Sequence, residues 1–464
     1  MLRALIARTH NALERMACSL GVDAGNPARY RHDDGPWLSP GSCASSEITV
    51  SWVTRLRTTT RLALGTDPGS LVPHYSRAMP SKYHHARLTD LTPATTYYYR
   101  IISPFEGAST HSFTLPAEGA RDLTFCIIGD MQPTDHQQFL VSRSVAEGVA
   151  RENPHLVVQL GDSVHRGTVQ EYWHWMWQAC EPFASRFPTL RAMGNHDWGY
   201  DLGKSWRRFF PIPFVDPKKS YYSQHVGNVH AVFLDCYEND ERMGSQQLSW
   251  LKEQLQSSPP GCWKFVFLHA SIFSSGMENM DYTVQQQLLP LFDRHGVHAV
   301  FYGHDHIYEH YRYAYGQNDR VFSPGHRPTG RPIHYFLSGG GGAPLEDTFG
   351  IHHRPLSMHH RTWYSPQKGE FVRDEWAVRS WTSAHTVPEA PQCANPGAHV
   401  TCHMPSAVAQ DDCTHFGFEY GENACHYLRV MIQGEQCTVS VQYPDGSNVS
   451  GPNGQFPQVW KIFL

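Results

Sequence analysis

Short runs that alternate apolar and polar residues dominate the chain from Glu47 to Leu115. Ile48–Thr54 alternates at a period of two, and Thr95–Ile102 is a second run of β-branched and aromatic residues. Clusters of Gly and Pro separate runs of this kind, which is typical of short strands joined by turns. The pattern predicts a small β-sandwich of immunoglobulin or fibronectin type over residues 41–118.

Near Arg121 the pattern changes, and strand-like runs alternate with helix-like runs until about residue 340. Such alternation indicates a layered α/β domain, which we place at residues 119–345. Thr134 and Gln137 fit a capping box that opens a helix ending near Arg151. A second helix is indicated by one apolar stripe that faces the core, made of Leu248, Leu251 and Leu255 with Trp250 beside them.

The remaining segments are less regular. Residues 1–40 show no clear period and are predicted to be irregular. Residues 346–412 are rich in His, Pro and Trp without periodicity, which favours an insertion or a long loop. Residues 413–464 contain two strand-like runs, Tyr427–Ile432 and Thr438–Tyr443. We expect these runs to form a hairpin that completes the α/β domain.

Composition excludes several classes of function. The net charge is −5 and charged residues make up 17 % of the chain, with no basic stripe, so no nucleic-acid-binding surface is expected. No apolar run reaches the roughly 18 residues of a transmembrane segment. The apolar run Ala4–Ala7 is too short for the core of a signal peptide. Five of the 11 cysteines lie between Cys393 and Cys437 in no zinc-binding pattern, so disulfides and ordinary thiols both remain open.

Five apolar runs share one feature, because each leads directly into a potential metal ligand. Ligands of open α/β sheets bind beyond the carboxyl ends of the strands, so these polar residues should converge on one site. The runs are Leu123–Gly129 before Asp130, Leu156–Gly161 before Asp162, Leu190–Gly194 before Asn195-His196-Asp197, Phe265–Leu268 before His269, and Ala299–Gly303 before His304-Asp305-His306.

Chance explains some of these motifs and not others. With 30 His in 464 residues, His-x-His is expected roughly twice at random, so His304 and His306 alone carry little weight. Gly-Asn-His-Asp at Gly194–Asp197 is expected only roughly 0.003 times and is a strong signal. The run Gly339–Gly342 is either a phosphate-binding loop without its usual Lys or a tight turn.

In their order along the chain, the five polar motifs that follow the apolar runs resemble the five sequence blocks of the calcineurin-like metallophosphoesterases. The resemblance covers about residues 121–345. Ser51–Thr54 and Leu91–Arg100 are similar to the fibronectin-like domain of purple acid phosphatases. The resemblance implies a layered α-β-β-α domain behind a small all-β sandwich. It also implies metal-dependent hydrolysis of phosphate esters, with a monoesterase of acid phosphatase type as the first expectation. The alternatives are a phosphodiesterase or nucleotidase with the same site, and a binding protein with a degenerate metal site.

The same resemblance implies two divalent or trivalent metal ions that activate a water molecule. Asp162 occupies the position that bridges the two ions. Asp130 and His306 would complete the first ion, and the second would be completed by Asn195, His269 and His304. A ligand set of nitrogen and oxygen without Cys favours Fe, Mn or Zn over a structural thiolate zinc.

Three further residues receive catalytic roles. By resemblance, His196 contacts the phosphate and acts as general acid for the leaving group. Asp197 is suited to orient the His196 ring, although a carboxylate that caps a turn is the alternative. Arg166 resembles the phosphate-binding Arg of the Ser/Thr phosphatases and is otherwise a counter-ion of the carboxylates.

Two departures from the family pattern matter. The first block reads Asp130-Met131-Gln132, where the family has Asp-x-His or Asp-x-Gly. Gln132 either binds the first metal, orients its water or merely packs. His165 stands where purple acid phosphatases place the Tyr that gives their colour, so a purple protein is not expected. His165 itself either replaces that Tyr as a metal ligand or contacts the ligands without binding the metal. The resemblance favours a secreted, vacuolar or lysosomal protein.

Overall fold

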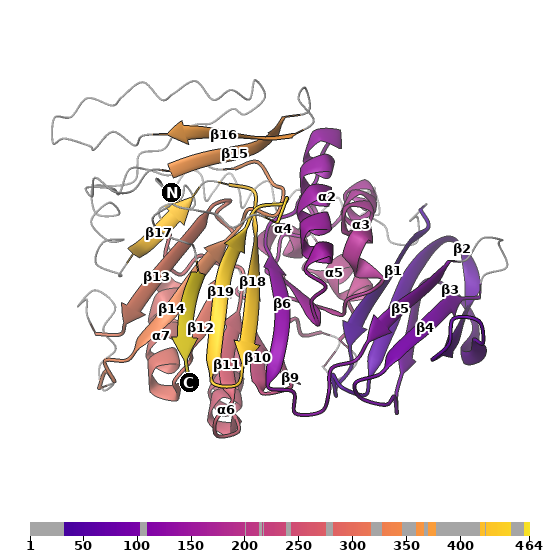
Figure 1. Ribbon diagram of the computed structural model, residues 1–464, viewed down its shortest axis with the longest axis horizontal. Coiled ribbons are helices and arrows are strands. Elements are labelled where there is room, and N and C mark those ends of the chain that lie inside the picture. The colour runs from indigo at the N-terminus through magenta and orange to yellow at the C-terminus, as the bar shows by residue number, and fades with distance from the viewer. Residues whose placement is uncertain are drawn as a thin grey trace.

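The computed structural model describes residues 32–102, 109–199, 201–212, 216, 218–237, 243–274, 282–316, 327–345, 359–365, 370–376, 418–422, 424–446 and 459–464. An all-β domain at the N-terminal end of the chain lies against a larger α/β domain (Figure 1). Among the described helices, none is both long enough and apolar enough to cross a membrane.

The N-terminal domain is one antiparallel sheet that folds over its own core. Its strands are β1 (Asp34–Pro40), β2 (Ile48–Gly65), β3 (Val72–Leu88), β4 (Thr96–Ile101) and β5 (Thr110–Thr114). They pair in the order β1-β2-β4-β5, and β3 pairs with the other edge of β2. Register shifts between Val53 and Thr60 mark where the long β2–β3 pair deforms. One buried cluster joins residues from both halves of β2, such as Ile48 and Leu62, with residues of the other strands.

Two sequence expectations change here. The two layers of the predicted sandwich belong to a single hydrogen-bonded sheet, because β2 pairs with β1 at one end and with β4 at the other. The segment predicted to be irregular contributes a strand, since residues 34–40 form β1. Trp37 and Leu38 in that strand are fully buried, and Pro36 and Pro40 obscure its period in the sequence.

The larger domain contains two facing sheets. The first has the order β20-β19-β18-β6-β7-β8, and the second has the order β17-β13-β14-β12-β11-β10-β9. Strands of the first sheet are β6 (Asp122–Ile128), β7 (Leu156–Gln159), β8 (Thr189–Arg191), β18 (Tyr427–Gln433), β19 (Gln436–Gln442) and β20 (Val459–Phe463). Strands of the second are β9 (Tyr222–Val226), β10 (Val229–Phe233), β11 (Trp263–Phe267), β12 (Ala299–Tyr302), β13 (Tyr308–Ala314), β14 (Pro332–Ser338) and β17 (Phe418–Glu422).

The helices cover the outer faces of these sheets. They are α2 (His136–Arg151), α3 (Gln170–Ala184), α4 (Asn195–Trp198), α5 (Lys204–Phe209), α6 (Ser245–Ser257) and α7 (Tyr282–His295). Helix α2 starts at His136 with Asp135 as its N-cap, because Asp135 Oδ1 accepts hydrogen bonds from two backbone N–H groups of the first turn. The expected capping box at Thr134 is therefore wrong by one residue, whereas the end at Arg151 is confirmed. Leu251 and Leu255 of α6 are buried as the stripe predicted.

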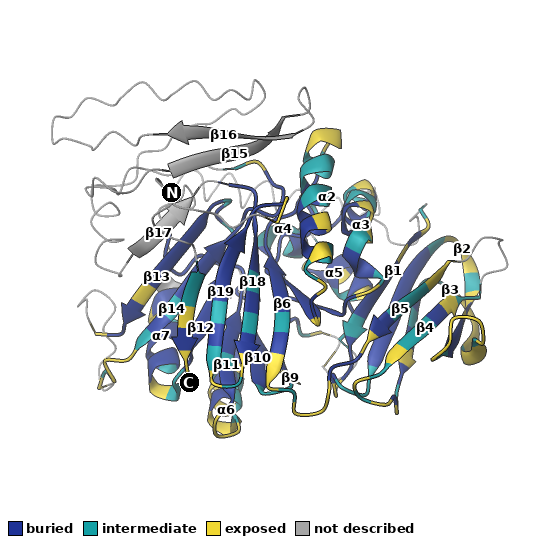
Figure 2. Ribbon diagram, in the orientation of Figure 1, coloured by how far each residue is buried: buried dark blue, intermediate teal, exposed yellow. Residues whose placement is uncertain are grey.

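Alternating residues of each central strand face different layers. In β6, Phe125 and Ile127 join the core between the sheets, while Cys126 and Ile128 face the core under α2 and α3. In β11, Phe267 faces the first sheet and Val266 belongs to the core that includes residues of α6 and α7. Both faces of the central strands are buried and the helices expose one side (Figure 2). The order of layers is therefore α-β-β-α, as expected.

The C-terminal strands complete the first sheet. β18 and β19 form an antiparallel hairpin that turns at Gly434, and β18 pairs with β6. Within residues 346–412 the structure describes only the hairpin of β15 (His359–Ser365) and β16 (Glu370–Trp376). Cys425 and Cys437 are buried free thiols, and Cys393, Cys402 and Cys413 lie outside the described residues.

Aromatic stacking joins the two domains. Trp37 of β1 stacks on Trp177 of α3 with ring centroids 3.8 Å apart, and its Nε1 donates to the Phe209 carbonyl at 3.2 Å. The Tyr99 hydroxyl of β4 donates to the carbonyl of Ser185, just after α3, at 2.8 Å. These contacts fix the N-terminal domain beside α3.

An ion pair between the two domains should make the stability of the folded protein depend on pH. His174 Nδ1 of α3 lies 2.8 Å from Oδ1 of buried Asp34, and this hydrogen bond raises the pKa of His174. His32 stacks on the same ring, Gln178 donates to Asp34, and Glu171 and Asp33 are the other charged neighbours. Because the folded-state pKa is raised, the pair stabilises the protein fully below about pH 6.5 and loses this effect as pH rises through the raised pKa.

We therefore expect His174→Gln to lower the urea midpoint more at about pH 5 than at about pH 9. Replacing exposed His74 by Gln is the control and should show no such difference. An equal loss at both pH values would show that the pair does not titrate as described.

Candidate metal centre

The loops that follow five parallel strands bring the predicted ligands together. Asp130 and Asp162 follow β6 and β7, and Asn195 follows β8, all in the first sheet. His269 follows β11, while His304 and His306 follow β12, both in the second sheet. The carboxyl ends of both sheets thus meet at one edge of the molecule, which places ligands from distant parts of the chain in one cluster.

The backbone of this edge is strained. Asp130, Gln132, Asp162 and His304 have φ values of 58°, 34°, 47° and 81°, a region that residues other than Gly adopt rarely. Each such residue costs on the order of 1–3 kcal/mol and persists only where its surroundings hold it. Here Asp130 N–H donates to the Gly161 carbonyl at 3.2 Å, and Gln132 N–H donates to the Asp162 carbonyl at 3.3 Å. The two carboxylate loops therefore hold each other.

Glycines beside the ligands allow this close approach. A Cβ at Gly194 would overlap Asp162 Oδ1, and one at Gly303 would overlap Asp130 Oδ2. The run Gly339–Gly342 packs against the same loops, where Gly339 N–H donates to the Ile307 carbonyl and Gly341 N–H donates to the Gly129 carbonyl. Since those amides are already bonded, they favour a close-packing turn over a phosphate-binding loop.

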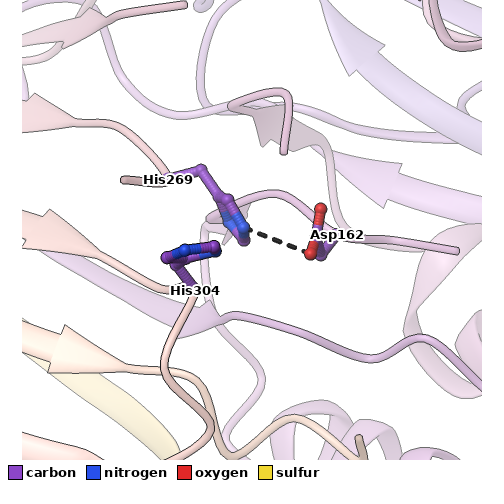
Figure 3. Close-up of side chains that lie close together, drawn as sticks. All are labelled: Asp162, His269 and His304. Atoms are coloured by element: carbon purple, nitrogen blue, oxygen red, sulfur yellow. Dashed lines mark ion pairs between the residues drawn. The ribbon is translucent and has the colours of Figure 1, made fainter. Parts of the chain in front are cut away.

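Asp162, His269 and His304 lie at the centre of the cluster (Figure 3). One potential ligand atom from each lies within 4.8 Å of the others, and His269 Nε2 is 3.2 Å from Asp162 Oδ2. Asn195 Oδ1 is 3.0 Å from His269 Nε2 and 3.1 Å from His304 Nδ1. The four side chains expected around the second metal and its bridge are therefore mutual neighbours.

Asp130 and His306 adjoin this group. Asp130 Oδ1 lies 3.8 Å from Nε2 of both His269 and His306. His306 Nδ1 is hydrogen-bonded to the Pro344 carbonyl at 2.8 Å, and His269 Nδ1 to the Leu160 carbonyl at 2.9 Å. Backbone carbonyls thus hold these two rings with Nε2 facing the carboxylates, which is how ligating histidines are usually oriented.

Electrostatics at the cluster favour positive charge. Burial lowers the pKa of His269, but the carboxylates of Asp162 and Asp130 outweigh it and raise the pKa to about 9. Burial lowers the pKa values of His304 and His306 to about 4, so these imidazoles are uncharged at neutral pH, the form in which histidine binds a metal. Burial also raises the pKa of Asp130 well above its usual value. A cation among these groups would supply the charge that the carboxylates require.

The donor set fits the two metal ions that the fold family implies. It offers carboxylate, amide and imidazole donors and no thiolate, which suits Fe, Mn or Zn. Asp162 Oδ2 faces the Nε2 atoms of both His269 and His196, while Asp162 Oδ1 accepts from the backbone N–H of His196.

His196 sits at the rim of this cluster. Its backbone N–H donates to Asp162 Oδ1 at 2.9 Å, and its Nε2 lies 3.9 Å from Asp162 Oδ2. The ring Nδ1 donates to the His165 carbonyl at 2.7 Å. The side chain is 35 % exposed, so Nε2 is open to a substrate while the ring stays held.

Of the two expectations for Asp197, the structure supports the carboxylate that caps a turn. Its Oδ1 accepts from the backbone N–H groups of Ser163 and Val164, and its Oδ2 accepts from that of Gly194. Asp197 therefore ties the Asp162 loop to the Asn195 loop, and the ring of His196 is oriented instead by the His165 carbonyl. Sequence reasoning missed this because a backbone carbonyl leaves no residue-specific signal.

Gln132 and Arg166 occupy different positions around the carboxylates. Gln132 is buried, and its Nε2 donates to Asp162 Oδ2 at 2.6 Å, so its amide contacts the carboxylate through the N–H₂ group. Arg166 is half-buried in the loop beside His165, whose pKa falls to about 4 through burial first and then the charges of His196 and Arg166.

We expect Gln132 to act through Asp162. Gln132→Leu keeps the side-chain volume but removes the hydrogen bond, and partners of this kind are typically worth about 10–100-fold in metal affinity or activity. Metal titration followed by calorimetry measures the change. Exposed Gln137 is the control, and an unchanged affinity in Gln132→Leu would contradict this role.

Comparison with known proteins identifies the same two domains. Residues 123–308 match the family model described as calcineurin-like phosphoesterase, and residues 34–115 match the purple acid phosphatase N-terminal domain. Purple acid phosphatase 18 of Arabidopsis thaliana is 26 % identical over 341 residues, covering 66 % of this chain and 73 % of the relative. Purple acid phosphatase 22 of the same plant is 28 % identical over 277 residues, covering 56 % of this chain and 59 % of the relative.

A solved structure shows the same fold. Purple acid phosphatase PPD1 from yellow lupin (Lupinus luteus) seeds superposes with a TM-score of 0.62 at 16 % identity, covering 92 % of this chain and 74 % of that one. The likeness extends across both domains, although it is too distant to transfer individual residues. The chain therefore combines a calcineurin-like phosphoesterase domain with the N-terminal domain of the purple acid phosphatases, and this pair of domains is that of a phosphoric ester hydrolase.

Proposed function

We propose that the protein is a phosphomonoesterase of acid phosphatase type that works with two metal ions. The observation that carries the proposal is the convergence of Asp130, Asp162, Asn195, His269, His304 and His306, with His196 Nε2 open at 3.9 Å from Asp162. When bound, two such ions activate water and neutralise charge on phosphorus. Fe, Mn or Zn would be held by these six side chains.

The chain's own groups have distinct tasks in this reaction. His196 is placed to donate a proton from Nε2 to the leaving oxygen, because the His165 carbonyl holds its other ring nitrogen. Asp197 keeps the loops of Asp162 and Asn195 in register through three backbone N–H groups. Arg166, half-buried beside His165, is the group we assign to the phosphate oxygens.

Monoesters fit this charge distribution better than diesters. A phosphate monoester carries about −1.5 to −2 charges at neutral pH, which is more negative than the single charge of a diester. Arg166 adds a guanidinium group next to His165, and His196 adds a polar ring nitrogen 3.9 Å from Asp162 Oδ2. The purple acid phosphatases among the relatives are named for the same activity.

The test compares two substrates on metal-loaded protein. We expect 4-nitrophenyl phosphate to be hydrolysed with a kcat/KM well above that for bis(4-nitrophenyl) phosphate, and a chelator to abolish both. Faster hydrolysis of the diester would favour the phosphodiesterase alternative. Hydrolysis of neither, with both metals bound, would favour a binding protein.

A further inference from the structure

One half-exposed ring stacks on His196, whose Nε2 we assign to proton transfer, and a second ring meets the first edge-on. The rings of His165 and His196 are stacked with centroids 5.0 Å apart and an interplanar angle of 29°. Tyr172, in the first turn of α3, meets the His165 ring edge-on at 5.7 Å and 82°. We name His165 and Tyr172 the aromatic ledge. Both residues are half-buried, so each leaves part of its surface accessible to solvent.

Hydrogen bonds hold this ledge in place. Gly167 N–H donates to the His196 carbonyl at 3.0 Å, and Trp173 Nε1 donates to the Gly167 carbonyl at 2.7 Å. Val169 N–H donates to the Arg166 carbonyl at 3.0 Å, which closes the turn between His165 and α3. The ledge is therefore bonded to the catalytic loop and to α3, and it needs little ordering when a ligand binds.

The position of the ledge defines what it would contact. A proton donor must lie within hydrogen-bonding distance of the leaving oxygen, so that oxygen lies near His196 Nε2. The first atoms of the leaving group then lie beside the ring that stacks on His196. Ring–ring contacts are favourable when the centroids lie about 4.5–7 Å apart, whereas an alkyl chain gains only its buried area.

We propose that the aromatic ledge selects phosphate monoesters of planar aromatic alcohols, that is, aryl phosphates of the phenolic type. The proposal rests on the proposed function and adds the class of leaving group. A phenolic ring is joined directly to the ester oxygen, so it reaches His165 and Tyr172 as soon as that oxygen reaches His196. Alkyl esters would bind through the phosphate alone.

The experiment compares two esters whose alcohols are about equally acidic, so that chemical reactivity does not mask recognition. Phenyl phosphate is the aryl substrate, and hexafluoroisopropyl phosphate is the alkyl substrate. We expect Tyr172→Leu to lower kcat/KM for phenyl phosphate by about 3- to 10-fold, mainly through KM. The alkyl ester should change by less than about twofold, and Tyr172→Phe should restore the aryl preference.

A matched control lies on the same helix. Trp175 of α3 is also half-buried, but it contacts Phe139 and His136 instead of His165. Trp175→Leu should leave both substrates unchanged. Inhibition by phenylphosphonate and ethylphosphonate gives an independent reading, since neither compound can be hydrolysed. In Tyr172→Leu, the inhibition constant of phenylphosphonate should rise relative to that of ethylphosphonate. In Trp175→Leu, the ratio of the two constants should stay unchanged.

If Tyr172→Leu lowers kcat/KM equally for the aryl and alkyl esters, or leaves the ratio of inhibition constants unchanged, the role proposed for the aromatic ledge is wrong. The assignment as a phosphatase would remain intact. A metal-loaded wild-type protein that hydrolyses neither ester would instead overturn the proposed function, and the ledge with it.

Discussion

Replacing His196 by Ala is expected to lower kcat by about 10²–10⁴-fold while both metal ions stay bound. The substitution removes Nε2, the atom placed to protonate the leaving oxygen, and a contact to phosphate. It keeps the backbone N–H that donates to Asp162 Oδ1, so the carboxylate stays oriented. Turnover and metal content of the same preparation measure the two effects separately.

The loss should depend on the leaving group. Alkyl alcohols need a proton as the ester bond breaks, whereas nitrophenolate leaves with little assistance. His196→Ala should therefore slow an alkyl phosphate far more than 4-nitrophenyl phosphate. Equal slowing of both substrates, or loss of a metal ion, would remove His196 from the role of general acid.

Replacing Asp162 by Asn is expected to remove at least one metal ion and to lower activity by about 10³-fold or more. Asn keeps the shape of the side chain but lacks the negative charge that His269 and the metals share. The pKa of His269 should then fall from about 9, because the Asp162 carboxylate is the first of the groups that raise it. Metal analysis and NMR titration of the histidines follow these changes.

Asp135→Asn is the matched control, because Asn caps a helix about as well as Asp. It should leave metal content and activity unchanged. An Asp162→Asn protein that keeps two ions and full activity would show that Asp162 does not bridge them.

The positions of the ligands could be predicted from the sequence because strand ends converge by topology. Runs such as Phe265–Leu268 are apolar throughout, as is typical of strands buried on both faces, and the polar residue after each run marks the same edge. Gly-Asn-His-Asp stood out through its rarity. The layer order followed from the same alternation of strands and helices.

The rest depends on tertiary contacts that no local pattern records. From the sequence, Asp197 is suited to orient its neighbour His196. In the structure its oxygens instead accept from the backbone N–H groups of Ser163, 34 residues away in the chain, and of Gly194, 3 residues away. Gln132 was considered as a carbonyl ligand, but its N–H₂ group donates to Asp162. The strand β1 is hidden in the sequence because its prolines break the period and because its two buried side chains face different cores, Trp37 that of the larger domain and Leu38 that of its own.

The proposed dinuclear centre is tested most directly by anomalous diffraction from crystals of the metal-loaded protein, with the metal content measured on the same sample. We expect two ions per chain on either side of Asp162, one near Asp130 and His306 and the other near Asn195, His269 and His304. A single ion, or two ions that do not share Asp162, would contradict it.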